Sequence, residues 1–339
     1  MIKVSSIGKY LDQPILSAKL NKNIPTIMAV GSSAIVLNQI NNAPKEERTK
    51  TGIKSAIILG STILSAVNAP KIASYITKRD GAKSLKAIQE SNTKLINEYL
   101  KKNKVEEKLL KIFNKAKTKI LTPKEIETIN EGQHRTFVNK LIPPPENIKA
   151  KDIFKEIGWL SVYGAVPVAG GIIGGITADK LTEQNWKKRI PNKVNEGIYQ
   201  YLANIFLCNI GAGAALGILE KFNIKSKSAR CVGMVCGIIL TGVIGGSAVA
   251  NFIGNKFINP LMNKNNKPDV RSPELLDIGL HTDDIATVSL LSGLKWIEPS
   301  LPLLYSISGY RAGIGYRNSD KHHNHSCHEK EAHFLRHKC

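Results

Sequence analysis

The chain has 339 residues, a formal net charge of +21 at pH 7 and a hydrophobic content of 42%. These averages resemble those of a soluble protein, but several windows are almost free of charge and the charged residues crowd between them. Lys greatly outnumbers Arg, which disfavours specific nucleic-acid binding because base recognition relies on bidentate arginine. No Walker loop, G-x-S-x-G or H-E-x-x-H motif occurs, so we expect neither an enzyme nor a cofactor.

Two apolar windows near the N-terminus predict the first membrane helices, at residues 24–40 and 53–69. The first window is short for a span, and the basic residues before it would also suit a secretory signal. No clear small-residue cleavage site precedes Pro44. We therefore predict an N-terminal membrane segment, residues 1–77, in which both helices are retained.

A long polar insert follows at residues 78–156. Apolar residues recur at three- and four-residue steps from 82 to 121, which predicts amphipathic helices, and the run 101–104 predicts a break between two of them. Thr122-Pro123-Lys124-Glu125 is typical of a helix start, with a capping residue followed by proline. The insert is basic, so we expect it to contact anionic lipid headgroups or a partner.

The strongest membrane signal lies in residues 157–311. The windows 157–178, 198–219 and 231–255 contain no charge, and each is close to the roughly 20 residues that a bilayer core demands. A soluble helix keeps one polar face, and these windows have none. The last window, 285–310, is broken by charges and prolines, which predicts either an interrupted span or an interfacial helix with a short membrane segment.

Small residues recur at four-residue spacing inside these windows. In a bilayer no hydrophobic force drives helices together, and small residues let two backbones approach closely enough to pack. In water the same glycines would cost about 1 kcal/mol each relative to alanine. We predict that they pack helices within one bundle or between copies of the chain. The predicted packing residues are Gly170, Gly174, Gly213, Gly217, Gly233, Gly237, Gly242, Gly246 and Gly254.

Two charges, Lys295 and Glu298, lie inside the broken last window at a spacing that places them on one helix face. A charge at the centre of a bilayer costs at least about 2.5–3.5 kcal/mol, so charges there are usually paired or functional. The pair is a candidate site for gating or solute binding. The alternative is an interfacial helix whose charged side chains reach water.

The C-terminal tail, residues 312–339, is rich in histidine and cysteine. Imidazole and thiolate bind zinc, copper or nickel, so weak binding of a transition metal is one interpretation of this tail. The alternative is a disordered polar terminus. The candidate metal ligands are His322, His323, His325, Cys327, His328, His333 and His337.

Together these features predict an all-α fold: a polytopic membrane helix bundle of about six small-xxx-small, glycine-rich spans with a basic amphipathic helical insert. The expected partners are the lipid bilayer, its anionic headgroups and a second copy of the chain. Lysines near the window ends favour a cytoplasmic insert and cytoplasmic termini. Three functions stay open: a structural or assembly protein of the membrane, a small transporter or channel that uses the broken segment, and a membrane-anchored recruiter of a soluble partner.

Overall fold

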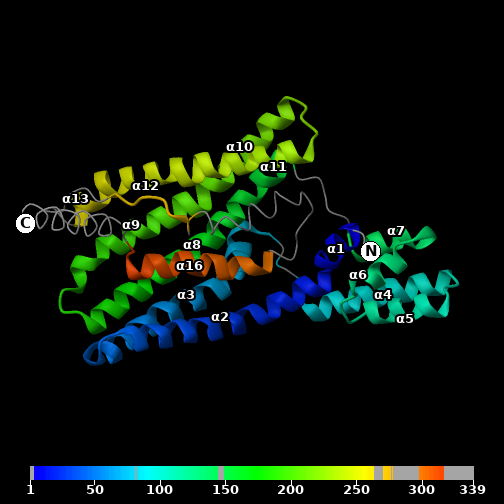
Figure 1. The fold of residues 1–339 in the computed structure, drawn as a ribbon, viewed down its shortest axis with the longest axis horizontal. Coiled ribbons are helices and arrows are strands. Elements are labelled where there is room, and N and C mark those ends of the chain that lie inside the picture. The colour runs from blue at the N-terminus through cyan, green and yellow to red at the C-terminus, as the bar shows by residue number, and fades with distance from the viewer. Residues whose placement is uncertain are drawn as a thin grey trace, which may run out of the picture.

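A computed structural model of the chain describes residues 4–79, 81, 83–143, 149–262, 270–275, 277 and 298–316. All regular secondary structure in these ranges is helical, as the sequence predicts. The molecule is elongated, with a bundle of long helices on one side and a group of short helices on the other (Figure 1).

Among the described residues, four helices are long and apolar enough to cross a membrane. At about 1.5 Å per residue each measures roughly 50 Å, which exceeds the roughly 30 Å of a bilayer core. Each contains one predicted window, the second to the fifth in chain order, so these windows are confirmed as long apolar helices. The four helices extend over Lys45–Thr77, Ala150–Thr182, Trp186–Lys221 and Ala229–Met262.

Inside the last two of these helices, α-helical stretches alternate with π-helical segments. The π-helical segments are η4, η5 and η6, and η4 packs against η5. The first two long helices comprise η1 (Lys45–Glu47) with α3 (Arg48–Thr77), and α8 (Ala150–Thr182). The last two comprise η3 (Trp186–Arg189), α9 (Ile190–Tyr201), η4 (Leu202–Phe206) and α10 (Leu207–Lys221), then α11 (Lys227–Gly237), η5 (Ile238–Gly246), α12 (Ser247–Ile253), η6 (Gly254–Ile258) and α13 (Asn259–Met262).

The first predicted span, residues 24–40, lies in α2 (Pro14–Asn42), which packs along α3. This helix has 29 residues, yet it is not among the four long apolar helices. Asparagine and glutamine at its C-terminal end, from Asn38 to Asn42, reduce its hydropathy. The structure therefore shows a long helix at this window, but this helix is not one of the four candidate spans.

The last predicted window is only partly described. Residues 285–297 lie outside the described ranges, and the remainder forms η7 (Glu298–Ser300) and α16 (Leu301–Ile314). The 14 residues of α16 extend about 21 Å, which is too short to cross a bilayer core. This helix packs between α3, α8 and α9, and it ends where Gly315 adopts a left-handed conformation beside Lys193.

The insert consists of short helices with a core of their own. The predicted break is confirmed, because one helix ends at Lys102 and the next begins at Glu107. Tyr99 and Phe137 stack with ring centroids 3.9 Å apart, over a buried cluster that includes Phe113. The helices are α4 (Leu85–Lys102), α5 (Glu107–Ala116), α6 (Pro123–Ile129), η2 (Gly132–His134) and α7 (Arg135–Leu141), and we call this group the insert.

The predicted helix start at Thr122 is confirmed as a capping box. The Thr122 amide donates to a Glu125 carboxylate oxygen over 2.7 Å, and the Glu125 amide donates back to the Thr122 hydroxyl over 3.3 Å. Burial raises the pKa of Glu125, but hydrogen bonds from Lys115 and Thr122 outweigh it and hold this pKa below its usual value. Glu125 thus stays ionised and keeps both ends of the cap satisfied.

The N-terminal helix α1 (Val4–Leu11) packs against α6 of the insert, whereas the sequence grouped these residues with the N-terminal membrane helices. Between α1 and α2, the Gln13 amide donates to the Leu121 carbonyl and accepts from the Leu121 amide, both over 2.8 Å. Lys9 donates to Asn130 over 2.7 Å. The N-terminal segment therefore attaches the insert to the bundle, in addition to the chain connections from α3 and to α8.

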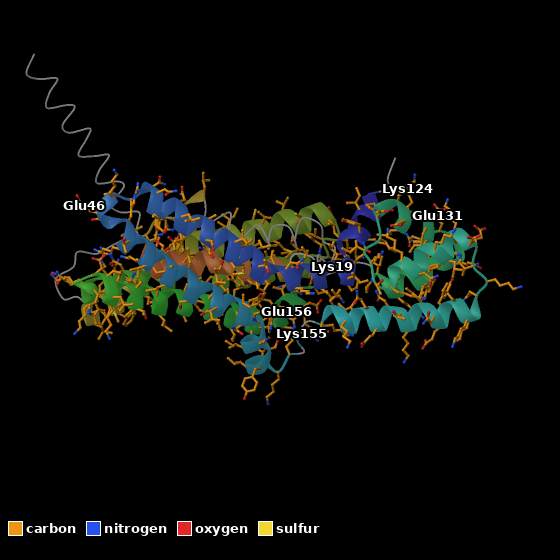
Figure 2. The ribbon with its side chains drawn as sticks, turned by 90° about the horizontal axis from the view of Figure 1, so that it is seen from below. Lys19, Glu46, Lys124, Glu131, Lys155 and Glu156 are labelled. Atoms are coloured by element: carbon orange, nitrogen blue, oxygen red, sulfur yellow. The ribbon has the colours of Figure 1, made fainter. Side chains whose placement is uncertain are left out.

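Labelled charged side chains lie toward both ends of the molecule and also between them, at Lys19, Lys155 and Glu156 (Figure 2). In Figure 2, Glu46 lies at the tip of the bundle, and Lys124 and Glu131 lie on the insert. The middle of the bundle carries large exposed apolar side chains. Val30, Leu64, Ile173, Val232 and Leu240 are between 61% and 68% exposed.

Candidate functional site

Five charged residues meet in the half of the bundle farthest from the insert. Glu196 lies on α9, Arg311 lies on α16, and Arg271, Glu274 and Asp277 lie on the segment after the last long helix. The side chains of Glu196, Arg271 and Asp277 have no exposed area. We call these five residues the arginine–carboxylate network.

Arg271 contacts two buried carboxylates. Its Nη2 atom donates to Asp277 Oδ2 over 3.0 Å, and its Nε atom lies 3.3 Å from Glu196 Oε2. Burial lowers the pKa of Arg271, but the charges of Glu196 and Asp277 outweigh it, so this pKa is raised. Arg271 is therefore permanently charged where water does not reach it, and the two carboxylates balance that charge.

Arg311 contacts the same two carboxylates from the other side. Its Nη1 atom donates to Asp277 Oδ1 over 3.1 Å, and its Nε atom lies 3.7 Å from Glu196 Oε1. Its Nη2 atom donates to Glu274 over 3.1 Å. Asp277 and Glu196 therefore each bridge both arginines, and three carboxylates face two guanidinium groups.

A polar ladder on α9 and η4 supports Glu196 from within the helix. Gln200 donates to Glu196 Oε1 over 2.8 Å, and Asn204 donates to Gln200 over 2.9 Å. The Asn204 side-chain amide also donates to Asp277 Oδ1 over 3.3 Å. The three residues are spaced by four, so they follow one face of an otherwise apolar helix.

Aromatic rings cover the two arginines. The Arg271 guanidinium lies 4.5 Å from the ring centre of Tyr199, and that of Arg311 lies 4.4 Å from the ring centre of Tyr316. Tyr316 donates to Glu274 over 2.7 Å. Burial raises the pKa of Glu274, but this hydrogen bond and the charges of both arginines hold it below its usual value.

A second ionic cluster surrounds Asp179 on α8. The Asp179 carboxylate lies 2.7 Å from Lys54 and 3.0 Å from Lys193, which is 1% exposed. Lys193 also donates to the Gly313 carbonyl on α16. Near the helix end, Lys50 lies 2.9 Å from Glu183, and this hydrogen bond lowers the pKa of Glu183 despite burial. We call this group the Asp179 cluster.

The arginine–carboxylate network and the Asp179 cluster each connect helices that are distant in sequence. The Asn251 side chain on α12 accepts from the Arg271 amide and donates to the Arg271 carbonyl, each over 2.9 Å. The segment that follows α13 is thereby held against α12, while its charges engage α9 and α16. Because every charge in the network faces an opposite charge, the arrangement suits fixed packing of helices better than attack on a substrate.

The predicted glycines lie at helix contacts of different closeness. A Cβ atom added to Gly170 or Gly174 would meet Ser65 or Ser61 of α3, and one added to Gly237 would meet the Gly211 carbonyl at 2.3 Å. Gly217 has only an ordinary contact, with the Ala150 side chain at 3.6 Å. The remaining predicted glycines face these neighbours: Gly213 faces Phe154, Gly233 faces Leu219, Gly242 faces Cys208, Gly246 faces Ala203, and Gly254 faces Asn195.

The other predicted sites fall outside what the structure describes. Lys295 lies in the undescribed range, and of Glu298 only its backbone turn is described. The histidine and cysteine tail, residues 317–339, is likewise outside the described ranges. Within the described residues, no group of three or more His, Cys, Asp or Glu side chains could hold a metal ion.

The arginine–carboxylate network was missed in the sequence. Two of its members lie just outside predicted windows, since Glu196 precedes the window at 198 and Arg311 follows the window ending at 310. The usable signal was the four-residue spacing of Glu196, Gln200 and Asn204 in an apolar helix, which implies a buried polar face. Arg271, in a charged connecting segment, gave no such signal.

No known protein family matches this chain, and neither a curated protein nor a solved structure resembles it significantly. The functional interpretation therefore depends on the geometry alone.

Proposed function

We propose that this chain is an integral membrane protein with a structural or assembly role, in which four long helices cross the bilayer and the insert forms a helical head at its surface. The supporting observation is an inverted distribution of polarity. Large apolar side chains such as Leu64 and Ile173 are exposed along the bundle, whereas Arg271 and Glu196 are buried inside it. This distribution suits hydrocarbon as the surrounding solvent.

Close helix contacts support the same proposal. A Cβ atom on Gly171 would lie 1.8 Å from the Gly309 carbonyl oxygen, and one on Gly175 would lie 2.0 Å from the Gly313 carbonyl oxygen. Small residues at such contacts are the usual means of packing helices in lipid. We propose that the glycine-rich faces of the spans pack the bundle internally, as the sequence pattern favours.

The transporter alternative has one supporting observation, the presence of buried charges in the apolar bundle. Each charged side chain of the network lies within 3.7 Å of an opposite charge. Three cavities lined by described residues have no network side chain in their walls. The recruiter alternative requires an open apolar surface on the insert, yet Phe113, Ile126 and Val138 are fully buried in its core. The structural role is therefore the better supported proposal.

Alkaline carbonate extraction of membranes combined with cysteine labelling tests the membrane assignment. In a chain whose native cysteines are replaced by alanine, we would introduce Ile244→Cys, since Ile244 is 57% exposed within the last long helix. The matched control is Lys225→Cys, in the exposed loop between α10 and α11.

We expect the chain to remain in the pellet after extraction. A hydrophilic maleimide should label the cysteine at 225 and leave the one at 244 unlabelled until detergent dissolves the membrane. Equal labelling of both positions in inside-out vesicles, or release of the chain by carbonate, would contradict the proposal. We propose a cytoplasmic insert, so labelling at 225 should require inside-out vesicles.

A further inference from the structure

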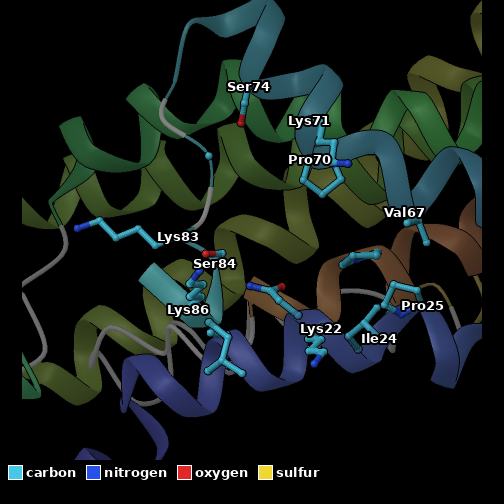
Figure 3. A pocket seen from close by; sticks show the side chains of 15 residues that line it. Lys22, Ile24, Pro25, Val67, Pro70, Lys71, Ser74, Lys83, Ser84 and Lys86 are labelled. Carbon is cyan, nitrogen blue, oxygen red and sulfur yellow. The ribbon is translucent and has the colours of Figure 1, made fainter. Parts of the chain in front are cut away.

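A cavity of about 730 Å³ lies where the bundle meets the insert. Its walls come from the N-terminal half of α2, the C-terminal part of α3, the first turn of α4 with the residues Gly81, Lys83 and Ser84 before it, and Pro302 at the start of α16. Figure 3 shows α2 and α3 on opposite sides of the opening, with the beginning of α4 between them. The volume is that of a typical ligand site.

The interior of this cavity is apolar. Ala18, Ile24 and Pro302 are buried, and Val67 and Leu85 are half-buried. These side chains offer dispersion contacts to hydrocarbon, while the polar lining residues are Asn21, Ser74, Ser84 and the lysines described next. The apolar part of the occupant would lie against the bundle helices.

Four lysines line the same cavity, one from α2 and three from the stretch that runs from the end of α3 to the start of α4. They are Lys22 on α2, Lys71 on α3, Lys83 in the connecting segment and Lys86 in the first turn of α4. Figure 3 shows all four around the opening. Among the described residues, none of them forms an ion pair.

The contrast with the opposite half of the bundle is informative. There, Lys54 and Lys193 each lie within 3.0 Å of the Asp179 carboxylate. Four ammonium groups that have no ion-pair partner among the described residues repel one another around this cavity, and an anion from outside the chain would reduce that repulsion. The occupant must therefore carry both negative charge and hydrocarbon.

We propose that this cavity binds an anionic phospholipid, with the phosphate among the four lysines and the upper acyl chains against the apolar wall. The site lies between the apolar bundle and the polar insert, which is the depth of the headgroups if the bundle crosses a bilayer. Basic pockets between membrane helices bind anionic headgroups in this way. The inference rests on the proposed membrane location, and it adds a specific lipid partner to it.

The test uses the full chain, purified and reconstituted into phosphatidylcholine nanodiscs that contain a small fraction of fluorescent phosphatidylglycerol. Energy transfer from Trp159 and the other native tryptophans to the lipid label reports enrichment of the anionic lipid around the protein. The cavity variant replaces Lys22, Lys71, Lys83 and Lys86 by glutamine. The control variant replaces four exposed insert lysines that do not line the cavity, namely Lys101, Lys102, Lys104 and Lys108.

Each lysine near an anionic surface contributes about fivefold in affinity, so the cavity variant should lose at least about tenfold in apparent affinity for phosphatidylglycerol. The control variant, which has the same net charge, should stay within about twofold of the original. Circular dichroism checks that both variants keep their helical content. An equal loss in both variants would overturn the inference, because general surface charge would then explain the binding.

Competition separates a lipid from a free anion. Unlabelled phosphatidylglycerol should displace the fluorescent lipid, whereas inorganic phosphate or glycerol phosphate at millimolar concentration should not. Displacement by either soluble anion would overturn the lipid assignment. A chain that resists carbonate extraction but shows no lipid preference would disprove the lipid site and leave the membrane proposal standing, so the two failures are distinguishable.

Discussion

Arg271 combines complete burial with a permanent charge, although it lies on a connecting segment rather than on a helix. The carboxylates of Glu196 and Asp277 lie within 3.3 Å of its guanidinium and offset the free-energy cost of burying this charge. Removing Arg271 leaves three carboxylates facing the single guanidinium of Arg311, and the excess buried negative charge costs more than the original pair contributes. Replacing Arg271 should therefore lower the stability of the folded chain by a large amount.

We predict that Arg271→Gln destabilises the folded chain by about 3–5 kcal/mol, measured by thermal unfolding in detergent and by abundance in the membrane. Lys111→Gln is the control, since Lys111 and Glu107 form an ion pair over 2.7 Å in which both side chains are more than 75% exposed. The exposed pair contributes at most about 1 kcal/mol. Similar losses in the two variants would contradict a special role for the buried network.

Helix packing at the element scale depends on where the glycines face. Gly171 of α8 meets the backbone of Gly309 on α16, and the contact is so close that even a methyl group would overlap a carbonyl oxygen. Gly60 of α3 has no atom within 4 Å of an added Cβ atom among the described residues. Position 171 therefore has no room for a side chain, whereas position 60 does.

We predict that Gly171→Ala lowers stability by about 1–3 kcal/mol, because the two backbones must move apart. Gly60→Ala should be neutral or slightly stabilising, since alanine favours the helix by about 1 kcal/mol. Thermal unfolding of both variants in the same detergent is the measurement. If Gly60→Ala were the more damaging change, the observed bundle contacts would be wrong.

At the scale of the whole molecule, the insert is held to the bundle through the N-terminal segment as well as through its two connections. Gln13 lies between α1 and α2 and forms two hydrogen bonds with the backbone of Leu121 in the insert. It is 4% exposed, so neither Leu121 group has ready access to water when the side chain is removed. This amide therefore helps to set the orientation of the insert.

We predict that Gln13→Ala destabilises this junction by about 1–3 kcal/mol, because buried backbone groups lose their partners. Hydrogen exchange of the Leu121 amide should accelerate accordingly. Gln89→Ala serves as the control, since Gln89 also donates to a backbone carbonyl, that of Thr118 over 3.0 Å, but from an exposed position. Unchanged exchange at Leu121 in the first variant would refute the proposed attachment.

Hydropathy by itself determined the all-helical class, the four long apolar helices and the position of the insert, because each follows from residues adjacent in sequence. The break after Lys102 and the cap at Thr122 were predictable for the same reason, since capping and amphipathic periodicity act within a few residues. The window at 24–40 was overestimated because the amides at its end reduce its hydropathy.

Only the tertiary structure brought Arg271 to Glu196 and gathered four lysines around one cavity. Arg271 lies far along the chain from Glu196, and Lys22 lies far from the three other lysines. Each charge alone resembles an ordinary solvated one. Whether such a charge is balanced depends on which helices become neighbours, and that is decided by packing across the whole bundle. The network and the lysine cavity are therefore properties of the folded chain, while the apolar helices that position them are properties of the sequence.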